Sequence, residues 1–309
     1  MKTLIHPEVA VRAMNHFWKV AAPVWAFFER QTRFFQLGER VPIDAIMKGL
    51  KDLGFDGIEL GVFDPAKDGA QEEMRRVEQL LRSNGLEVPN LYVDIAGHWP
   101  LASFTHPDHR IRRDVVQLLK KSVEIAKGYG IGMIGISPDC DGFPHPFGVS
   151  YKDAWKWMSE GVSECVDAAT DAGLRFAFEY KPKETRNFSL IANADAALRL
   201  VEHIKSNNFG VLLDTGHALY AKEDLPTTVE KLDKKLFHVH VCDNYGDWDD
   251  DLPPGAVHDF TGFFKALRRI DYQGYVGLDI YPMQDPFGDC KKSKAYIDEV
   301  YAKLRTQAD

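Results

Sequence analysis

The sequence predicts a single α/β domain of the (β/α)8 TIM barrel class with a C-terminal tail helix. Two observations predict this fold: short apolar runs alternate with segments of helical periodicity, and several of these runs are apolar at almost every position. Strands that alternate with helices pair in parallel, and parallel strands covered on both faces are apolar nearly throughout. A length of 309 residues suits one barrel domain.

Eight β-then-α units favour a closed barrel, and an open doubly wound sheet is the alternative. No GxGxxG segment follows a predicted strand, which argues against a dinucleotide-binding open sheet. Predicted helices cover residues 43–53, 70–84, 110–128, 151–172, 193–205, 226–232 and 259–269. Predicted strands cover residues 55–62, 86–95, 131–137, 174–180, 209–215, 235–242 and 275–281, with a weaker first strand near 13–19. We expect residues 1–282 to form the barrel and 283–309 a tail helix of the same domain, available to pack on a neighbouring subunit.

The bulk composition argues against nucleic acid and membranes as partners. The formal net charge is −8 and the sequence pI is about 5.8, so no general attraction to DNA or anionic membrane is expected. The four cysteines form no CxxC motif, which indicates reduced thiols in a reducing compartment. The first residues lack the apolar run of a signal peptide, and no stretch approaches the ~20 apolar residues of a membrane span. We therefore expect a cytoplasmic protein.

Four consecutive predicted strands carry a possible metal ligand at their carboxyl ends. These residues are Glu179, Asp214, His240, which shares a strand face with His238, and Asp279. The carboxyl ends of barrel strands converge on one rim, where such folds place their active sites. A mixed carboxylate and imidazole shell suits Mg²⁺, Mn²⁺ or Co²⁺, and carboxylates crowded together repel strongly without a cation. The pattern predicts a divalent metal site.

The loop after the seventh predicted strand is strongly acidic, with five aspartates between Asp243 and Asp251. Two interpretations of this loop stay open on composition. Asp249 and Asp251 would bind a second cation together with Asp214 and His217, which stands three residues after Asp214. Alternatively, the run is a solvated acidic loop, as charge runs usually are.

Several motifs resemble the xylose isomerase-like barrel family of metal-dependent sugar isomerases and epimerases. They are FEYKPKE, LLDTGHA, HVHVCDNYGDWDDDL, GLDIYP and FTHPD, and the resemblance covers most of the chain. It implies two divalent metals per chain (Mn²⁺, Mg²⁺ or Co²⁺) and favours the metal-binding interpretation of the acidic loop. The implied ligands of the structural metal are Glu179, Asp214, His240 and Asp279. The implied ligands of the catalytic metal are Asp214, His217, Asp249 and Asp251.

The sequence also departs from the family pattern. Asp279 stands where the ketose 3-epimerases have a glutamate that acts as acid or base, and Gly61 stands where the isomerases have a ring-opening histidine. His98 or Asp64 is a candidate for that missing role, or the enzyme takes the open-chain sugar. Trp99, next to His98, offers an aromatic platform for a sugar ring or covers the barrel rim.

The expected function is an aldose–ketose isomerase, an intramolecular oxidoreductase of carbohydrate metabolism that acts on a small free sugar through a two-metal hydride shift. The candidate catalytic residues are Glu179, Lys181, His217, Asp249 and Asp251. The candidate substrate contacts are His98, Trp99, Lys181, which would steady the substrate oxygen, and His217. A single-metal sugar 3-epimerase, or a keto-sugar or glycoside lyase of the same family, is the alternative. An abasic-DNA endonuclease would need a basic surface, and a non-enzymatic barrel would not need the complete ligand set. We expect a homodimer or homotetramer.

Overall fold

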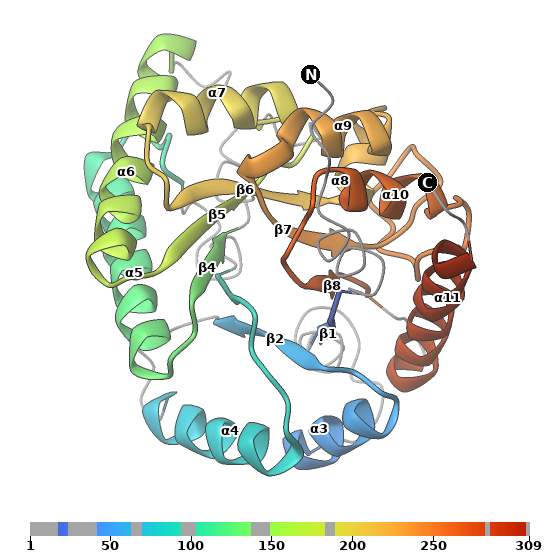
Figure 1. Cartoon of the computed structure of the whole chain (residues 1–309). Coiled ribbons are helices and arrows are strands. Elements are labelled where there is room, and N and C mark those ends of the chain that lie inside the picture. Colours follow the sequence, from blue (N-terminus) through green and yellow to red (C-terminus); the bar gives the residue numbers. More distant parts are fainter. Residues whose placement is uncertain are drawn as a thin grey trace, which may run out of the picture.

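Eight parallel strands form a closed barrel in the computed structural model, which describes residues 18–23, 42–62, 70–93, 103–136, 149–182, 189–281 and 285–306. Each strand pairs with its neighbours in chain order, and β1 pairs with β8 (Figure 1). The strands are β1 (Val20–Pro23), β2 (Gly57–Val62), β3 (Leu91–Val93), β4 (Met133–Ile136), β5 (Arg175–Glu179), β6 (Phe209–Asp214), β7 (Leu236–Val241) and β8 (Val276–Leu278). The predicted fold class is confirmed, and the open sheet is wrong.

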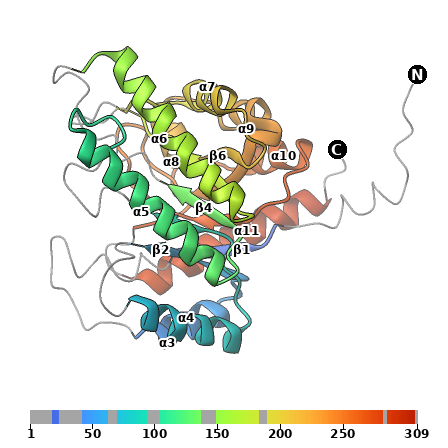
Figure 2. The same cartoon turned by 90° about the vertical axis from the view of Figure 1, so that its left-hand side faces the viewer.

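Helices surround the barrel and cover the outer face of its strands. They are α3 (Ile43–Asp52), α4 (Ala70–Asn84), α5 (His109–Gly128), α6 (Tyr151–Asp171), α7 (Ala194–Ile204), α8 (Thr215–Tyr220), α9 (Leu225–Leu232), the short 3-10 helix η3 (Asp233–Lys235), α10 (Thr261–Arg269) and α11 (Pro286–Thr306). Figure 2 shows α5 and α6 running side by side along one flank, with α3 and α4 packed together next to them. No helix among these described segments is long and apolar enough to cross a membrane.

Local sequence signals explain where the helices begin and end. Asp108 caps α5 by accepting a hydrogen bond from the Arg110 amide, and Asn193 caps α7 in the same way. Gly85 and Gly130, which follow α4 and α5, have φ angles of +60° and +69°. Glycine adopts this left-handed conformation without steric cost, so the chain can turn from each helix into the next strand.

Two details of the predicted elements differ from the structure. The first strand lies at Val20–Pro23, after the predicted range of 13–19, of which residues 13–17 fall outside the described residues. Its four residues are all buried and show no alternation that would mark them as a strand. Helix α8 was not predicted, because six residues are too few to show helical periodicity.

The tail helix α11 packs on the barrel of its own chain. Tyr301 lies with its ring centroid 5.8 Å from that of Trp18 and 5.4 Å from that of Phe264. Ile297, Val300 and Leu304 are also buried and belong to the same apolar core as the strands and the other helices. The apolar face of α11 is therefore used inside the chain and is not left for a neighbouring subunit.

We expect Ile297→Ala to lower the free energy of unfolding by about 2–5 kcal/mol, because Ile297 is fully buried in the shared core. Urea denaturation of the purified protein measures this change. Lys291→Ala, at an exposed position of α11, is the matched control and should leave stability nearly unchanged. Wild-type stability for Ile297→Ala would show that α11 is not part of the same folding unit.

Candidate functional site

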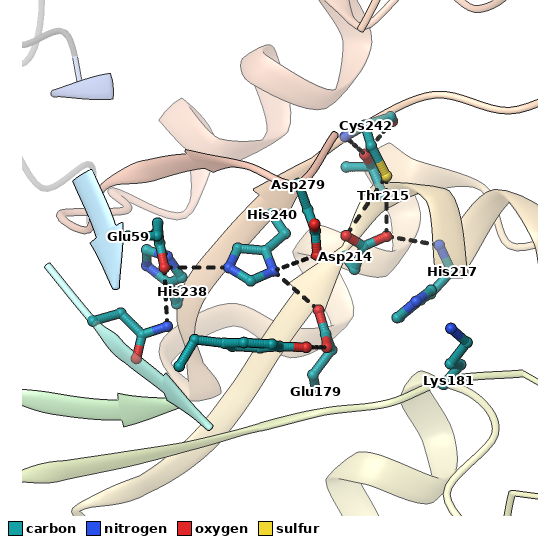
Figure 3. Close-up of polar contacts among 12 residues, drawn as sticks. Glu59, Glu179, Lys181, Asp214, Thr215, His217, His238, His240, Cys242 and Asp279 are labelled. Atoms are coloured by element: carbon teal, nitrogen blue, oxygen red, sulfur yellow. Dashed lines mark hydrogen bonds and ion pairs between the residues drawn. The ribbon is translucent and has the colours of Figure 1, made fainter. Parts of the chain in front are cut away.

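The four predicted strand-end residues meet at the carboxyl end of the barrel. Glu179, Asp214, His240 and Asp279 each offer a ligand atom within 4.8 Å of the others (Figure 3). His240 Nδ1 lies 3.1 Å from Glu179 Oε1 and 3.4 Å from Asp279 Oδ2. Two neighbouring ligand atoms about 2.0–2.1 Å from one cation lie roughly 2.8–3.4 Å from each other in octahedral or tetrahedral geometry. The spacing and the oxygen and nitrogen donors therefore fit a divalent cation.

A second group of possible ligands shares Asp214 with the first. Asp214, His217 and Asp249 have ligand atoms within 4.8 Å of one another. Asp214 ends β6 and caps α8, where its Oδ1 accepts a hydrogen bond of 2.8 Å from the His217 amide. The ring of His217 is fixed at Nδ1, which lies 2.9 Å from the carbonyl oxygen of Tyr180. A proton on Nδ1 leaves Nε2, on the side of Asp249, as the nitrogen able to bind a cation.

Asp249 is held by two basic side chains through one of its oxygens. Its Oδ2 lies 2.9 Å from Lys181 Nζ and 3.2 Å from His217 Nε2. Its Oδ1 is buried and has no hydrogen-bond partner among the described residues. A buried carboxylate oxygen normally has a partner, so Oδ1 fits the role of a cation ligand.

The acidic loop is built into the site. The side chain of Asp249 is only 7% exposed, whereas Asp247 and Trp248 of the same loop are exposed. Asp251 has a φ of +48°, and its backbone oxygen accepts a hydrogen bond from the Tyr281 amide. Asp251 is half-buried, and its carboxyl group lies near Asp214, Asp249 and Asp279, but its oxygens do not have the ligand spacing of the second group. A simple solvated loop does not describe these two inward-facing residues.

A buried aspartate anchors the base of this loop. Asp243 accepts hydrogen bonds from the amides of Val257 and His258 and lies 2.7 Å from His258 Nδ1. The backbones of Asp243 and Leu252 are joined by two hydrogen bonds of 2.8 Å. Asn244 Nδ2 donates to the carbonyl oxygen of Gly216 in α8. The loop is therefore tied to itself and to the helix that carries His217.

The crowding of buried charges shifts several pKa values. Burial raises the pKa of Asp214 to about 7, with His217 opposing the rise and the neighbouring carboxylates adding to it. Burial also raises the pKa of Asp251 well above its usual range, and Asp249 and Asp279 raise it further. Burial favours neutral His217, but the charges of Asp214 and Asp249 outweigh it and raise its pKa. A divalent cation would relieve this repulsion among carboxylates.

Three polar residues next to the site were not predicted. Glu59, on β2, is fully buried, with one oxygen 2.5 Å from His238 Nε2 and the other 3.4 Å from His240 Nε2. Tyr92, on β3, donates a hydrogen bond to Glu179 Oε2, and Asn90 donates one to Glu59. The signal for Glu59 was a single charged residue inside the apolar run FDGIELGV.

The predicted substrate contacts His98 and Trp99, and the alternative Asp64, lie outside the described residues. The structure brings the other predicted site residues to one end of the barrel. Gly61 lies on β2 and is paired with Tyr92 of β3.

The family model of the xylose isomerase-like TIM barrel matches residues 47–305, so the chain belongs to this family. Fructoselysine 3-epimerase of Shigella flexneri is 24% identical over 258 residues, which span 82% of this chain and 91% of that protein. A solved L-ribulose 3-epimerase superposes with a TM-score of 0.76 at 16% identity, covering 94% of this chain and 96% of that one. The IOLI protein, solved with a zinc atom, superposes with a TM-score of 0.71 at 16% identity over 93% of this chain and 99% of that one. Homologues of this chain are thus sugar epimerases, and the solved structures share its fold.

We expect the metal-free protein to lose stability as the pH rises from about 5 to about 8. Four buried groups have folded pKa values above their usual ones: Asp214, Asp251, His217 and His240. Above the unfolded pKa values of about 3.9 for Asp and 6.5 for His, the folded state holds more protons, so stability falls with rising pH. Asp249 and Glu59 have lowered pKa values, so their contribution to stability increases as the pH rises, mainly below about pH 4.

Urea denaturation at a series of pH values, with a chelator present, measures this slope. Asp214→Asn should make the slope shallower, because one of the titrating groups is gone. Excess Mn²⁺ should reverse the slope, because metal binding needs deprotonated ligands. Stability of the metal-free protein that rises over this pH range would contradict the expectation.

Proposed function

We propose that the protein is a divalent-metal-dependent sugar isomerase that interconverts an aldose and a ketose by a hydride shift, with two metals per chain. The observation that carries the proposal is the second group of ligands, in which Asp214 is shared and one oxygen of Asp249 is buried with no partner in the described part of the chain. Two ligand groups joined by one carboxylate are suited to two neighbouring cations. Glu179, Asp214, His240 and Asp279 would hold the first, and Asp214, His217, Asp249 and Asp251 the second.

The reaction balances within the sugar. The hydrogen on C2 moves to C1 as a hydride, while the proton on O2 leaves and is returned to O1, so no redox cofactor is needed. The bound metals would supply Lewis acidity that polarises the adjacent hydroxyl and carbonyl oxygens. Asp249 and Asp251 would be the bases that pass this proton, directly or through a water.

Lys181 would stabilise the substrate oxygen that gains negative charge. Its Nζ lies 2.9 Å from Asp249 Oδ2, which places the lysine at the edge of the second group. Since Glu179 and Lys181 are i and i+2, their side chains point toward the same side. A fixed donor beside developing charge is a common source of rate acceleration.

A single-metal ketose epimerase is the second candidate, and the relatives favour it. Fructoselysine 3-epimerase and L-ribulose 3-epimerase are the names of two similar proteins. In this reaction Glu179 would remove the proton from the carbon that is inverted, and Asp279 would serve on the other side. Asp279 is one methylene shorter than the glutamate expected there, which is why we rank this candidate second. A lyase acting on keto-sugars would use the same base.

We expect Asp249→Ala/Asp251→Ala to bind one metal per chain where the wild type binds two, and to lose isomerisation of the sugar. Elemental analysis after dialysis against Mn²⁺, followed by assays on a panel of aldoses and ketoses, tests both results. Asp247→Ala is the control, because it removes a carboxylate from the same loop at an exposed position. One metal in all three proteins would reject the two-metal isomerase and favour the epimerase.

We expect Lys181→Met to lower kcat by about 10²- to 10³-fold, as the loss of a donor to an oxyanion does, with metal content unchanged. Steady-state kinetics on the sugar identified in the panel gives kcat and KM separately. Lys231→Met is the control, because this lysine pairs with Asp195 away from the site. A change in KM alone would mean that Lys181 binds the ground state without stabilising the transition state.

A further inference from the structure

A layer of buried polar side chains lies inside the barrel beside the candidate metal ligands. Glu59, Asn90 and His238 have no exposed surface. Glu59 contacts His238 at 2.5 Å through Oε1, while its Oε2 accepts from Asn90 at 3.1 Å and contacts His240 Nε2 at 3.4 Å. The interiors of barrels of this class are usually filled by branched apolar side chains. Burying a carboxylate here costs free energy of folding unless it is fully hydrogen-bonded. The presence of Glu59 therefore indicates a role besides packing.

Two glycines make room for this layer. A Cβ atom on Gly277 of β8 would lie 2.4 Å from Glu59 Oε1 and 3.1 Å from His238 Nε2. A Cβ atom on Gly135 of β4 would lie 2.6 Å from Asn90 Nδ2. The missing side chains of Gly277 and Gly135 therefore leave space for Glu59 and Asn90. The barrel interior accommodates the carboxylate.

Glu59, His238 and His240 also have the spacing of metal ligands, but their contacts are those of a hydrogen-bond network. His238 Nε2 and Glu59 Oε1 are 2.5 Å apart, whereas two atoms on one cation would be roughly 2.8–3.4 Å apart. His240 has its other nitrogen, Nδ1, turned toward Glu179 and Asp279. The two ring nitrogens of His240 thus face two different carboxylate groups (Figure 3).

We propose that Glu59 is a positioning residue for the metal centre: its Oε2 accepts the Nε2–H of His240 and so turns Nδ1 toward the candidate cation. The inference rests on the first metal site of the proposed function. A metal-binding histidine is oriented and made more basic when its second nitrogen donates to a carboxylate. The other contacts of Glu59 are His238 Nε2 at Oε1 and Asn90 Nδ2 at Oε2. No sugar contact is assigned to Glu59.

Titration of the metal-free protein with Co²⁺, followed by visible absorption, tests this role without any sugar. We expect Glu59→Gln, which has nearly the same size and shape, to bind Co²⁺ about 10- to 100-fold more weakly and to change the absorption spectrum. Glu59→Asp keeps the buried charge but withdraws it by one methylene, and should also weaken binding. It tests the same contact should Glu59→Gln fail to fold, as judged by circular dichroism.

His238→Gln is the matched control, because it alters the other contact of Glu59 and leaves the contact with His240 in place. It should bind Co²⁺ nearly as the wild type does. Equal weakening in His238→Gln and Glu59→Gln would overturn the inference, since general loosening of the barrel would then explain both. Unchanged Co²⁺ affinity and spectrum in the two Glu59 variants would also overturn it.

The outcome for Glu59 is separable from that for the proposed function. Weaker Co²⁺ binding in the Glu59 variants supports the inference even if the wild type isomerises no sugar. A wild type that binds no Co²⁺ would overturn the metal site and the inference together.

Discussion

Repulsion among buried carboxylates is the constraint on which the rest of this structure depends. Glu179, Asp214 and Asp279 converge at the carboxyl end of the barrel, and the acidic loop adds Asp249 and Asp251 from the side. Taking such charges out of water is expensive, and their mutual repulsion adds to the cost. Histidines and one lysine offset part of it, but the raised pKa values of Asp214 and Asp251 show that the balance is incomplete. The arrangement has the charge and the spacing that a divalent cation fits.

The surrounding structure keeps these side chains from moving apart. Helix α8 begins on Asp214, so the same carboxylate that faces both ligand groups also fixes the helix carrying His217. Asp243 closes the acidic loop, and Glu59 and Tyr92 contact His240 and Glu179. Each contact is supplied by a different strand or loop. The site is thus prepared before any ligand arrives, which lowers the reorganisation needed at the moment of reaction.

Residues with a local signal could be predicted from the sequence, and residues that depend on three-dimensional neighbours could not. Glu179 and Asp214 each end an apolar run, and a closed parallel barrel brings such ends together whatever the helices do. The sequence left open whether the aspartates of the acidic loop face water or the site, because the same run of aspartates is compatible with both. Asp249 points inward onto Lys181 and His217, and the backbone pairing of Asp243 with Leu252 closes the loop around it. Glu59 was missed because the sequence of its own strand does not indicate that His238 and His240 contact it inside the barrel.

The choice between isomerase and epimerase depends on Asp249 more than on the fold. A TM-score of 0.76 with an L-ribulose 3-epimerase reflects the shared barrel, and the same barrel supports different reactions through its loops. Lys181 and His217 both occupy Asp249 Oδ2, so this oxygen is already neutralised. Oδ1, which is buried and has no partner among the residues the structure describes, is then the oxygen placed to take a cation. A one-metal epimerase gives that oxygen no partner, whereas a second cation beside Asp214 does, which is the physical reason for ranking the two-metal isomerase first.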